Sequence, residues 1–134
     1  LTSTATGNDF IFEAEQFVTD LAVKECRLKV FEAGTLLLAM YGEGKTRGQV
    51  TEIKISATCN QACAAIIVDD TLINRDFLKI RLLENYEETR KAAVGGAQPN
   101  LNLSKVRDIP VLLPKLVEQT EIVRRVEELF DFAN

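Results

Sequence analysis

Two segments of this sequence contain the residue types of a phosphate and magnesium site. Residues 39–46 satisfy a loose phosphate-loop pattern that ends in Lys45 and Thr46, with alanine in place of the first glycine. Residues 65–70 form an apolar run closed by two aspartates, like the strand and terminal acid that hold magnesium in NTPases. A phosphate loop must, however, open directly into a helix, because the helix N-terminus helps to hold the phosphates. Residues 47–55 have turn and strand character instead, so an NTPase is the weakest of three hypotheses for this chain.

The sequence contains few residues suited to other kinds of catalysis. The sequence has no histidine, which removes the commonest zinc ligand and the usual general base. The three cysteines, Cys26, Cys59 and Cys63, are an odd set that argues against a disulfide framework. In a strand the last two would lie about 13 Å apart, too far to share a metal ion, so we interpret all three as small core residues. We expect no catalytic residue, no metal site and no bound cofactor in this chain.

Loops rich in Lys, Arg, Asn and Gln favour DNA binding instead, because these side chains match phosphates and base edges. The net charge is −4, but residues 89–107 contain four basic residues and no acid, so the remainder carries −8. An acidic body with one basic segment can still present a positive face to phosphates; the alternative is an unevenly charged, solvated surface. The candidate DNA-binding residues are Lys45, Thr46, Arg47, Arg90, Lys91, Gln98, Asn100, Asn102 and Lys105.

Several of these candidates also have a purely structural interpretation. Asn100 and Asn102 are equally suited to bond the backbone of their own loop. Arg90 and Lys91 lie late in an expected helix, where a positive charge complements the helix dipole. The Asn-Gln pair at 60–61 opens an expected buried strand, which favours internal hydrogen bonds over DNA contact.

Apolar and alternating runs predict the strands of one sheet. The expected strands are residues 10–12, 28–31, 35–41, 50–55, 61–68 and 109–114, after a loosely ordered start at 1–9. The runs 35–41 and 61–68 are largely apolar and should be buried, whereas polar residues interrupt 50–55 and indicate an exposed strand. Two prolines restrict 109–114 to a sheet edge.

Three helices complete the expected elements. A short helix capped by Thr19 or Asp20 should reach residue 25, and a long one should cover 74–94 before the glycines at 95–96. The last helix, residues 116–132, is too apolar to stand alone and should pack on a partner helix. Its expected packing residues are Leu116, Val123, Val126 and Phe130. A protein-interaction module, which docks or self-associates through this helix, is therefore the second hypothesis.

These elements predict a mixed α/β (α+β) fold, a twisted, mostly antiparallel or mixed sheet with flanking helices and a C-terminal amphipathic helix. The 134 residues suit one domain. No apolar run approaches the roughly 18 residues that span a bilayer, so we expect no membrane contact and a cytoplasmic location. Because residue 1 is Leu, we expect a fragment of a longer protein.

Three stretches, residues 33–48, 59–66 and 95–123, together resemble the specificity subunits of type I restriction–modification systems. Their order and spacing match over roughly residues 28–132. The resemblance implies a target recognition domain at 1–114, without part of its N-terminal region, followed by the start of the conserved spacer helix at 115–134. It also implies a non-catalytic chain that binds double-stranded DNA.

The resemblance further implies partners. Methyltransferase subunits would methylate adenine with S-adenosylmethionine, and a restriction or motor subunit would cleave DNA with ATP and magnesium. Motifs shared by relatives with different targets cannot distinguish those targets, so the recognisable motifs are better candidates for architecture or phosphate contact. Residues that read bases should lie elsewhere, in 1–27 or 49–58.

Overall fold

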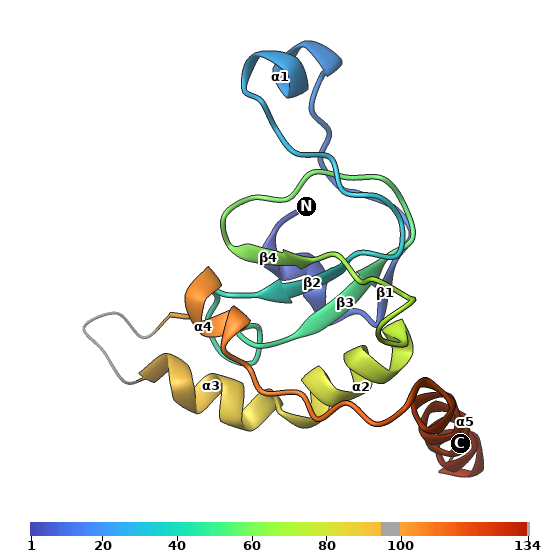
Figure 1. The fold of residues 1–134 in the computed structure, drawn as a ribbon. Helices are drawn as coiled ribbons and strands as arrows, with labels where there is room; N and C mark the ends of the chain where they lie inside the picture. Colours follow the sequence, from blue (N-terminus) through green and yellow to red (C-terminus); the bar gives the residue numbers. More distant parts are fainter. Residues whose placement is uncertain (95–99, 134) are drawn as a thin grey trace.

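The computed structural model describes residues 1–94 and 100–133, the side chains of 92–94 excepted. Its centre is a four-stranded sheet in the order β1-β3-β2-β4 (Figure 1). The strands are β1 (Phe10–Ile11), β2 (Leu36–Ala39), β3 (Val50–Ile53) and β4 (Cys63–Ile66). Strand β2 runs antiparallel to both of its neighbours, whereas β1 is parallel to β3. The mixed sheet with flanking helices confirms the predicted fold class.

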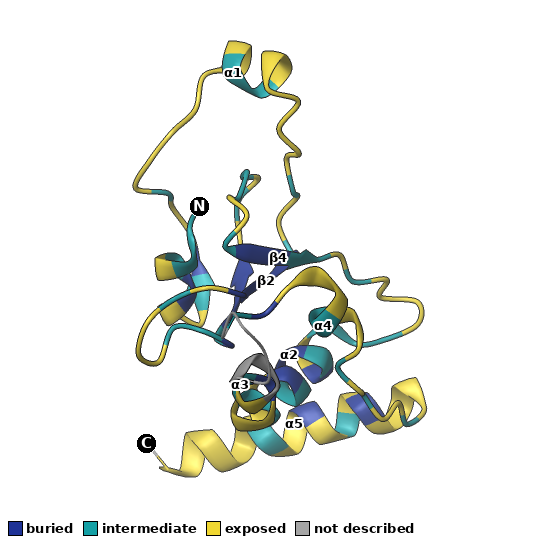
Figure 2. Cartoon of the chain, turned by 90° about the vertical axis from the view of Figure 1, so that its left-hand side faces the viewer, coloured by how far each residue is buried: buried dark blue, intermediate teal, exposed yellow. Residues whose placement is uncertain are grey.

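Strand β2 is buried along its whole length, as predicted, because both faces of the sheet are covered (Figure 2). Leu36 and Leu38 face one side, where they join a cluster that includes Leu82 and Leu101. Leu37 points to the opposite side. There it packs with residues of β1 and β3 beneath the N-terminal segment.

The N-terminal segment is ordered, and the prediction of a loose start was wrong. Residues Ser3–Gly7 form a 3₁₀ helix, η1, that contacts β2 and β3. The Leu1 ammonium group donates a hydrogen bond of 2.8 Å to the Thr58 carbonyl. Thr6 is buried, so this polar segment is nevertheless closely packed against the sheet.

Three strand predictions need correction. Residues 28–31 form no strand: only Phe31 makes an isolated bridge, to Ala57. Residues 109–114 are also unpaired and simply connect two helices. The 50–55 run does contain a strand, β3, but this strand is buried rather than exposed, since it lies between β1 and β2.

Strand β4 forms one edge of the sheet, is shorter than the predicted 61–68 run and is fully buried only at Cys63 and Ala64. Residues 61 and 62 belong to a turn before the strand, and Ile67 beyond it is exposed. Asn60 Oδ1 accepts a hydrogen bond from the Ala62 amide, as the structural interpretation of the Asn-Gln pair predicts.

The helix over 74–94 is interrupted. It consists of α2 (Arg75–Glu84) and α3 (Tyr86–Val94), which meet at Asn85. A further short helix, α4 (Leu103–Arg107), lies between α3 and residues 109–114 and was not predicted. The last helix, α5 (Leu116–Ala133), is confirmed and packs on α2. No helix in the described ranges is long and apolar enough to cross a membrane.

Residues 12–30 form an arm that leaves the sheet after Ile11 and returns to the fold through the bridge between Phe31 and Ala57. Ile11 is in register with Ile53, and the Gly34 amide donates to the Ile53 carbonyl at 2.7 Å. The tip of the arm carries α1 (Asp20–Glu25), which Thr19 caps as predicted. Figure 1 places α1 well away from the sheet, and Phe17 beside it is 85% exposed.

Candidate DNA interface

Loop 42–48 connects two antiparallel strands, β2 and β3. The Gly48 amide donates to the Ala39 carbonyl at 2.8 Å, and the Thr46 amide donates to the Glu43 carbonyl at 3.2 Å. Gly44 and Gly48 have φ angles of +57° and +90°, which glycine adopts without strain. Since the loop leads into a strand and not into a helix, the phosphate-loop interpretation is wrong.

The aspartates at the end of β4 have local partners. Asp69 accepts hydrogen bonds from the amide and hydroxyl of Thr71, which lower the pKa of its carboxyl group. Asp70 pairs with Arg75 at 2.6 Å. These contacts stabilise the turn before α2. The two aspartates therefore have a structural role, in place of the magnesium binding that the sequence pattern suggested.

Helix α3 holds loop 42–48 through two side chains one turn apart. The guanidinium of Arg90 donates to the Arg47 carbonyl at 2.8 Å and to the Gly44 carbonyl at 2.7 Å. The Tyr86 hydroxyl donates to the Lys45 carbonyl. The two side chains also contact each other, with the Arg90 guanidinium 5.2 Å from the centre of the Tyr86 ring.

Several other candidates lie close to this loop. The Leu101 amide donates to the Met40 carbonyl at 3.1 Å, so the segment that contains Asn100 returns to the end of β2. Helix α4 follows directly, with Lys105 in its last turn. The structure therefore brings the loop, α3 and the start of α4 to one end of the sheet (Figure 1).

The three candidates with amide side chains, Asn102, Asn100 and Gln98, differ from one another. Asn102 caps α4, because its Oδ1 accepts from the Lys105 amide at 2.8 Å, and this confirms the structural interpretation for that residue. Asn100 is half-buried. Gln98 lies outside the described residues.

The remaining basic residues differ in their exposure. Lys45 is exposed, whereas Arg47 is half-buried. Lys91 is exposed and pairs with Glu88 at 2.6 Å, which raises the pKa of its ammonium group. Arg107 belongs to the basic segment 89–107 but is not among the candidate DNA-binding residues; it is exposed in the last turn of α4. The acid-free stretch 89–107 was the signal that could have identified it.

The expected packing residues of α5 differ in their burial. Val123 is buried and Val126 half-buried. Leu116 and Phe130 are exposed. The buried contact is with α2 of the same chain, where Gln119 Oε1 accepts from the Asn74 amide at 2.8 Å. Contact with a partner helix, and the domain boundary at residue 114, stay predictions.

The cysteines are free thiols in three different environments. Cys63 is buried, which raises the pKa of its thiol to about 11. Cys59 is half-buried, but Cys26 lies exposed in the arm, so the core interpretation was wrong for Cys26. Among residues 1–94 and 100–133, no three potential ligands from His, Cys, Asp and Glu gather in one place.

Two hollows of the surface lie away from loop 42–48. One, of about 570 Å³, separates η1 and β1 from the start of the arm. The other, of about 320 Å³, lies between β4, α2 and α4, and its lining is apolar apart from Arg107. Neither has the polar, basic lining that phosphate binding requires.

A model of the type I restriction modification DNA specificity domain matches residues 2–134. The chain belongs to this family. The match includes residues 2–27, which contain no motif that the sequence analysis recognised. This specificity domain is also similar to the type I restriction enzyme MjaIX specificity subunit of Methanocaldococcus jannaschii, with 30% identity over 114 residues. The aligned region is 84% of this chain and 26% of that protein, so the chain spans about a quarter of its curated relative.

Proposed function

We propose that this specificity domain binds double-stranded DNA in a sequence-specific manner, as part of the specificity subunit of a type I restriction–modification complex. Membership of the DNA specificity family is the observation that carries the proposal. The domain would direct adenine methylation, and restriction where the system restricts, by partner subunits. This role favours a cytoplasmic location, where the DNA is.

We assign the chemistry of such a complex to its other subunits. Methyltransferase subunits would bind S-adenosylmethionine, and a restriction or motor subunit would bind ATP and magnesium. The resemblance to type I specificity subunits supports this division, in which the present chain is non-catalytic.

The candidate contact surface is the end of the sheet at loop 42–48 and α4. Lys45 is exposed at the loop, and Lys105 and Arg107 lie in the last turn of α4. Cationic side chains and backbone amides on loops are the usual phosphate ligands of DNA-binding proteins. Because the domain carries a net charge of −4, binding should depend on this local surface and should weaken steeply with salt.

The first test measures binding of the whole chain to a random-sequence duplex as the salt concentration rises. Lys45→Ala and Lys105→Ala should each weaken binding on every sequence, and each lost phosphate contact should reduce the slope of log K against log salt by about 0.9. Arg125→Ala on the exposed side of α5 removes the same charge away from the surface and serves as the control. Unchanged affinity in both lysine variants would contradict the proposed surface.

A second candidate function is protein docking through α5. Its C-terminal turns expose Leu129, Phe130 and Phe132, while Gln119 and Val123 near its start are buried. Large exposed apolar side chains close together on a projecting helix are typical of a partner interface. This candidate is compatible with DNA binding, since the two surfaces lie on different elements.

A further inference from the structure

Arg90 was a candidate DNA ligand, but its guanidinium already binds the protein backbone. It donates to the carbonyls of Gly44 and Arg47, at 2.7 and 2.8 Å. The Tyr86 hydroxyl donates to the Lys45 carbonyl, so two side chains of α3 bind three carbonyl groups of the loop. A group with its donors committed in this way is poorly placed to bind phosphate as well.

The contact depends on the shape of arginine. The planar guanidinium presents several N–H groups in a fixed fork, so one side chain reaches two carbonyls at once. Tyr86 and Arg90 are four residues apart and therefore lie on one face of α3. Gly48 completes the fit, because a Cβ atom there would lie 3.3 Å from Arg90 Cγ and from Tyr86 Cδ2.

This arrangement fixes the orientation of the loop backbone. The described chain contains no cis peptide bond, and in a trans peptide the carbonyl and the following amide point in opposite directions. Because the Gly44 carbonyl points to Arg90, the Lys45 amide points away from α3. No described residue accepts a hydrogen bond from that amide, and the exposed Lys45 side chain starts from the same residue.

We infer that Arg90 is a positioning residue, which holds loop 42–48 so that the backbone amide and side chain of Lys45 face a DNA phosphate. Tyr86 assists it through the Lys45 carbonyl. This inference rests on the proposed DNA-binding function. It assigns to Arg90 a role that acts through Lys45, with no direct contact to DNA.

The test compares Arg90→Lys with Arg90→Ala and Tyr86→Phe in the whole chain. Lysine keeps the charge but lacks the fork in which Nη1 and Nη2 of Arg90 each bind one carbonyl. Arg90→Lys should therefore weaken binding to a random-sequence duplex of about 30 base pairs roughly tenfold, as Arg90→Ala does. Because Arg90→Lys acts by releasing the Lys45 contact, it should lower the salt slope in the same direction as Lys45→Ala does. Tyr86→Phe, which changes no charge, should weaken binding in the same direction.

A second measurement follows the loop without DNA. Hydrogen exchange in peptides that cover residues 42–48 should become several-fold faster in Arg90→Lys and Tyr86→Phe, while Arg125→Ala should leave it unchanged. Thermal unfolding of each variant controls for general loss of stability.

The outcomes separate the inference from the function on which it rests. Normal affinity in Arg90→Lys with a loss in Arg90→Ala would identify Arg90 as a phosphate contact and overturn the inference. Unchanged loop exchange in Arg90→Lys would overturn it as well. If wild-type protein binds no duplex while Arg90→Lys speeds up loop exchange, the proposed function fails and Arg90 is a structural clamp only.

Discussion

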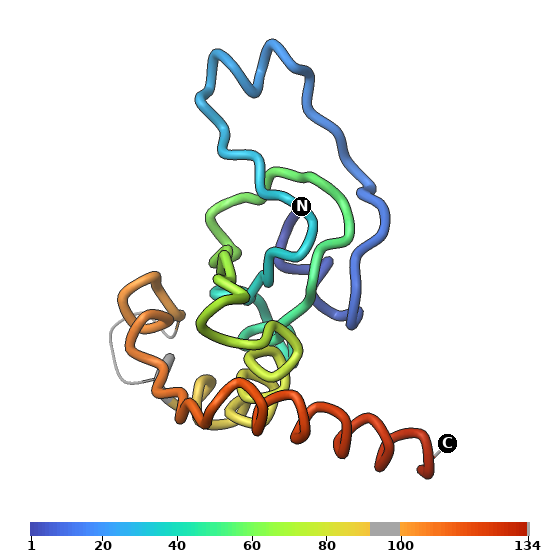
Figure 3. Tube along the Cα trace, turned by 45° about the vertical axis from the view of Figure 1, so that its right-hand side comes forward, coloured from blue at the N-terminus to red at the C-terminus, as the bar shows by residue number. Residues whose placement is uncertain are grey.

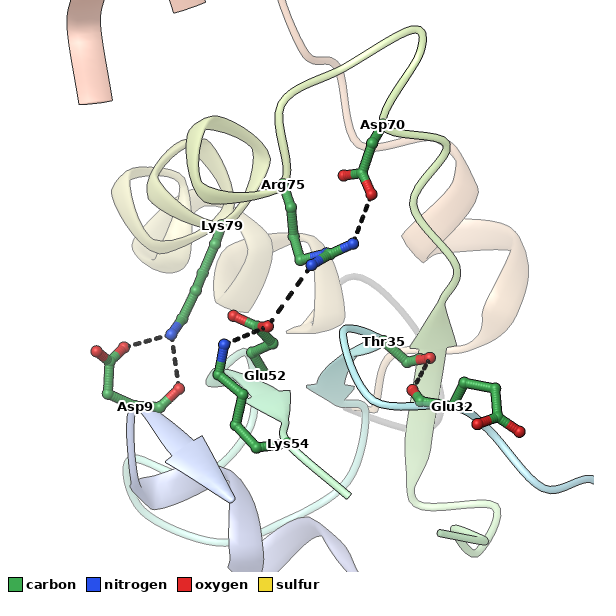
Figure 4. Close-up of polar contacts among 8 residues, drawn as sticks. All are labelled: Asp9, Glu32, Thr35, Glu52, Lys54, Asp70, Arg75 and Lys79. Atoms are coloured by element: carbon green, nitrogen blue, oxygen red, sulfur yellow. Dashed lines mark hydrogen bonds and ion pairs between the residues drawn. The ribbon is translucent and has the colours of Figure 1, made fainter. Parts of the chain in front are cut away.

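At the scale of single residues, Glu52 is the most unusual position in the fold. Its side chain is 2% exposed in the middle of the sheet. Lys54 Nζ lies 2.7 Å from its carboxylate and the Arg75 guanidinium 3.8 Å away, so the charge is compensated inside the protein (Figure 4). Arg75 also pairs with Asp70, and this network joins β3 to the turn before α2.

Replacing Glu52 tests how strongly this network stabilises the domain. Glu52→Gln keeps the volume but leaves Lys54 and Arg75 without their shared negative partner, so we expect a loss of about 2 kcal/mol in the free energy of unfolding. Urea denaturation at neutral pH measures the loss. Glu84→Gln, which breaks an exposed pair with Arg81, should cost less than about 0.5 kcal/mol. Equal effects of the two substitutions would show that the buried pair contributes nothing special.

The candidate site was only partly predictable at this scale, because short polar side chains serve two purposes. Asn102 and Asp69 fit both a ligand-binding pattern and a cap or turn, and in the structure they bond their own backbone. Arg90 shows the same ambiguity over a longer range. Its backbone partners are 43 and 46 residues away, and no local pattern could have indicated them.

At the scale of elements, Gln119 is the polar contact that joins α5 to the rest of the fold. Its side chain is 1% exposed and bonds at both ends. Oε1 accepts from the Asn74 amide at the start of α2, and Nε2 donates to the Pro114 carbonyl just before α5. One amide thus fixes both the position of α5 and the segment that leads to it.

Gln119→Ala should therefore destabilise the domain more than the loss of one side chain's apolar contacts would. It leaves the Asn74 amide and the Pro114 carbonyl without their partners, and we expect a loss of about 2 to 3 kcal/mol in chemical denaturation. The neighbouring Thr120→Ala is the matched control. Its hydroxyl bonds only the Leu116 carbonyl within the exposed helix, so it should change stability by no more than about 0.5 kcal/mol. A Gln119 variant as stable as the control would refute this role.

The sequence predicted the elements well where the hydrophobic pattern is long and less well where it is short. Helix α5 and the buried strand β2 were found, because each has a sustained pattern of its own. Strand β3 was expected to be exposed, since its polar residues gave no sign of the Lys54 and Arg75 partners that allow Glu52 to be buried. The break at Asn85 was missed because an interrupted helix keeps the same apolar periodicity.

At the scale of the whole molecule, α5 runs along the body of the domain and then continues past it (Figure 3). The part beyond the body exposes Leu129, Phe130 and Phe132, and Phe130 is 67% exposed. Helices with such a surface gain stability by packing on another helix. We therefore expect the isolated chain to self-associate at high concentration.

Sedimentation measurements over a range of protein concentrations test this expectation. Phe130→Ser should weaken self-association about tenfold while leaving the unfolding free energy of the domain nearly unchanged, because the Phe130 side chain is largely exposed. Truncation after Val126 is a second variant. A cut after Pro114 is unsuitable, since it would also remove Gln119. A wild-type chain that stays monomeric at all concentrations would contradict the expectation.

The arm has a consequence for how this domain tolerates change. It leaves the sheet after Ile11, which pairs with Ile53, and it is fixed again by the bridge between Phe31 and Ala57, so residues 12–30 are an insertion between two nearby anchor points. The entropy of closing such a loop grows only slowly with its length. The arm can therefore be shortened, lengthened or exchanged while the sheet and loop 42–48 keep their geometry, which separates the part of the chain that is free to diversify from the part that must stay constant.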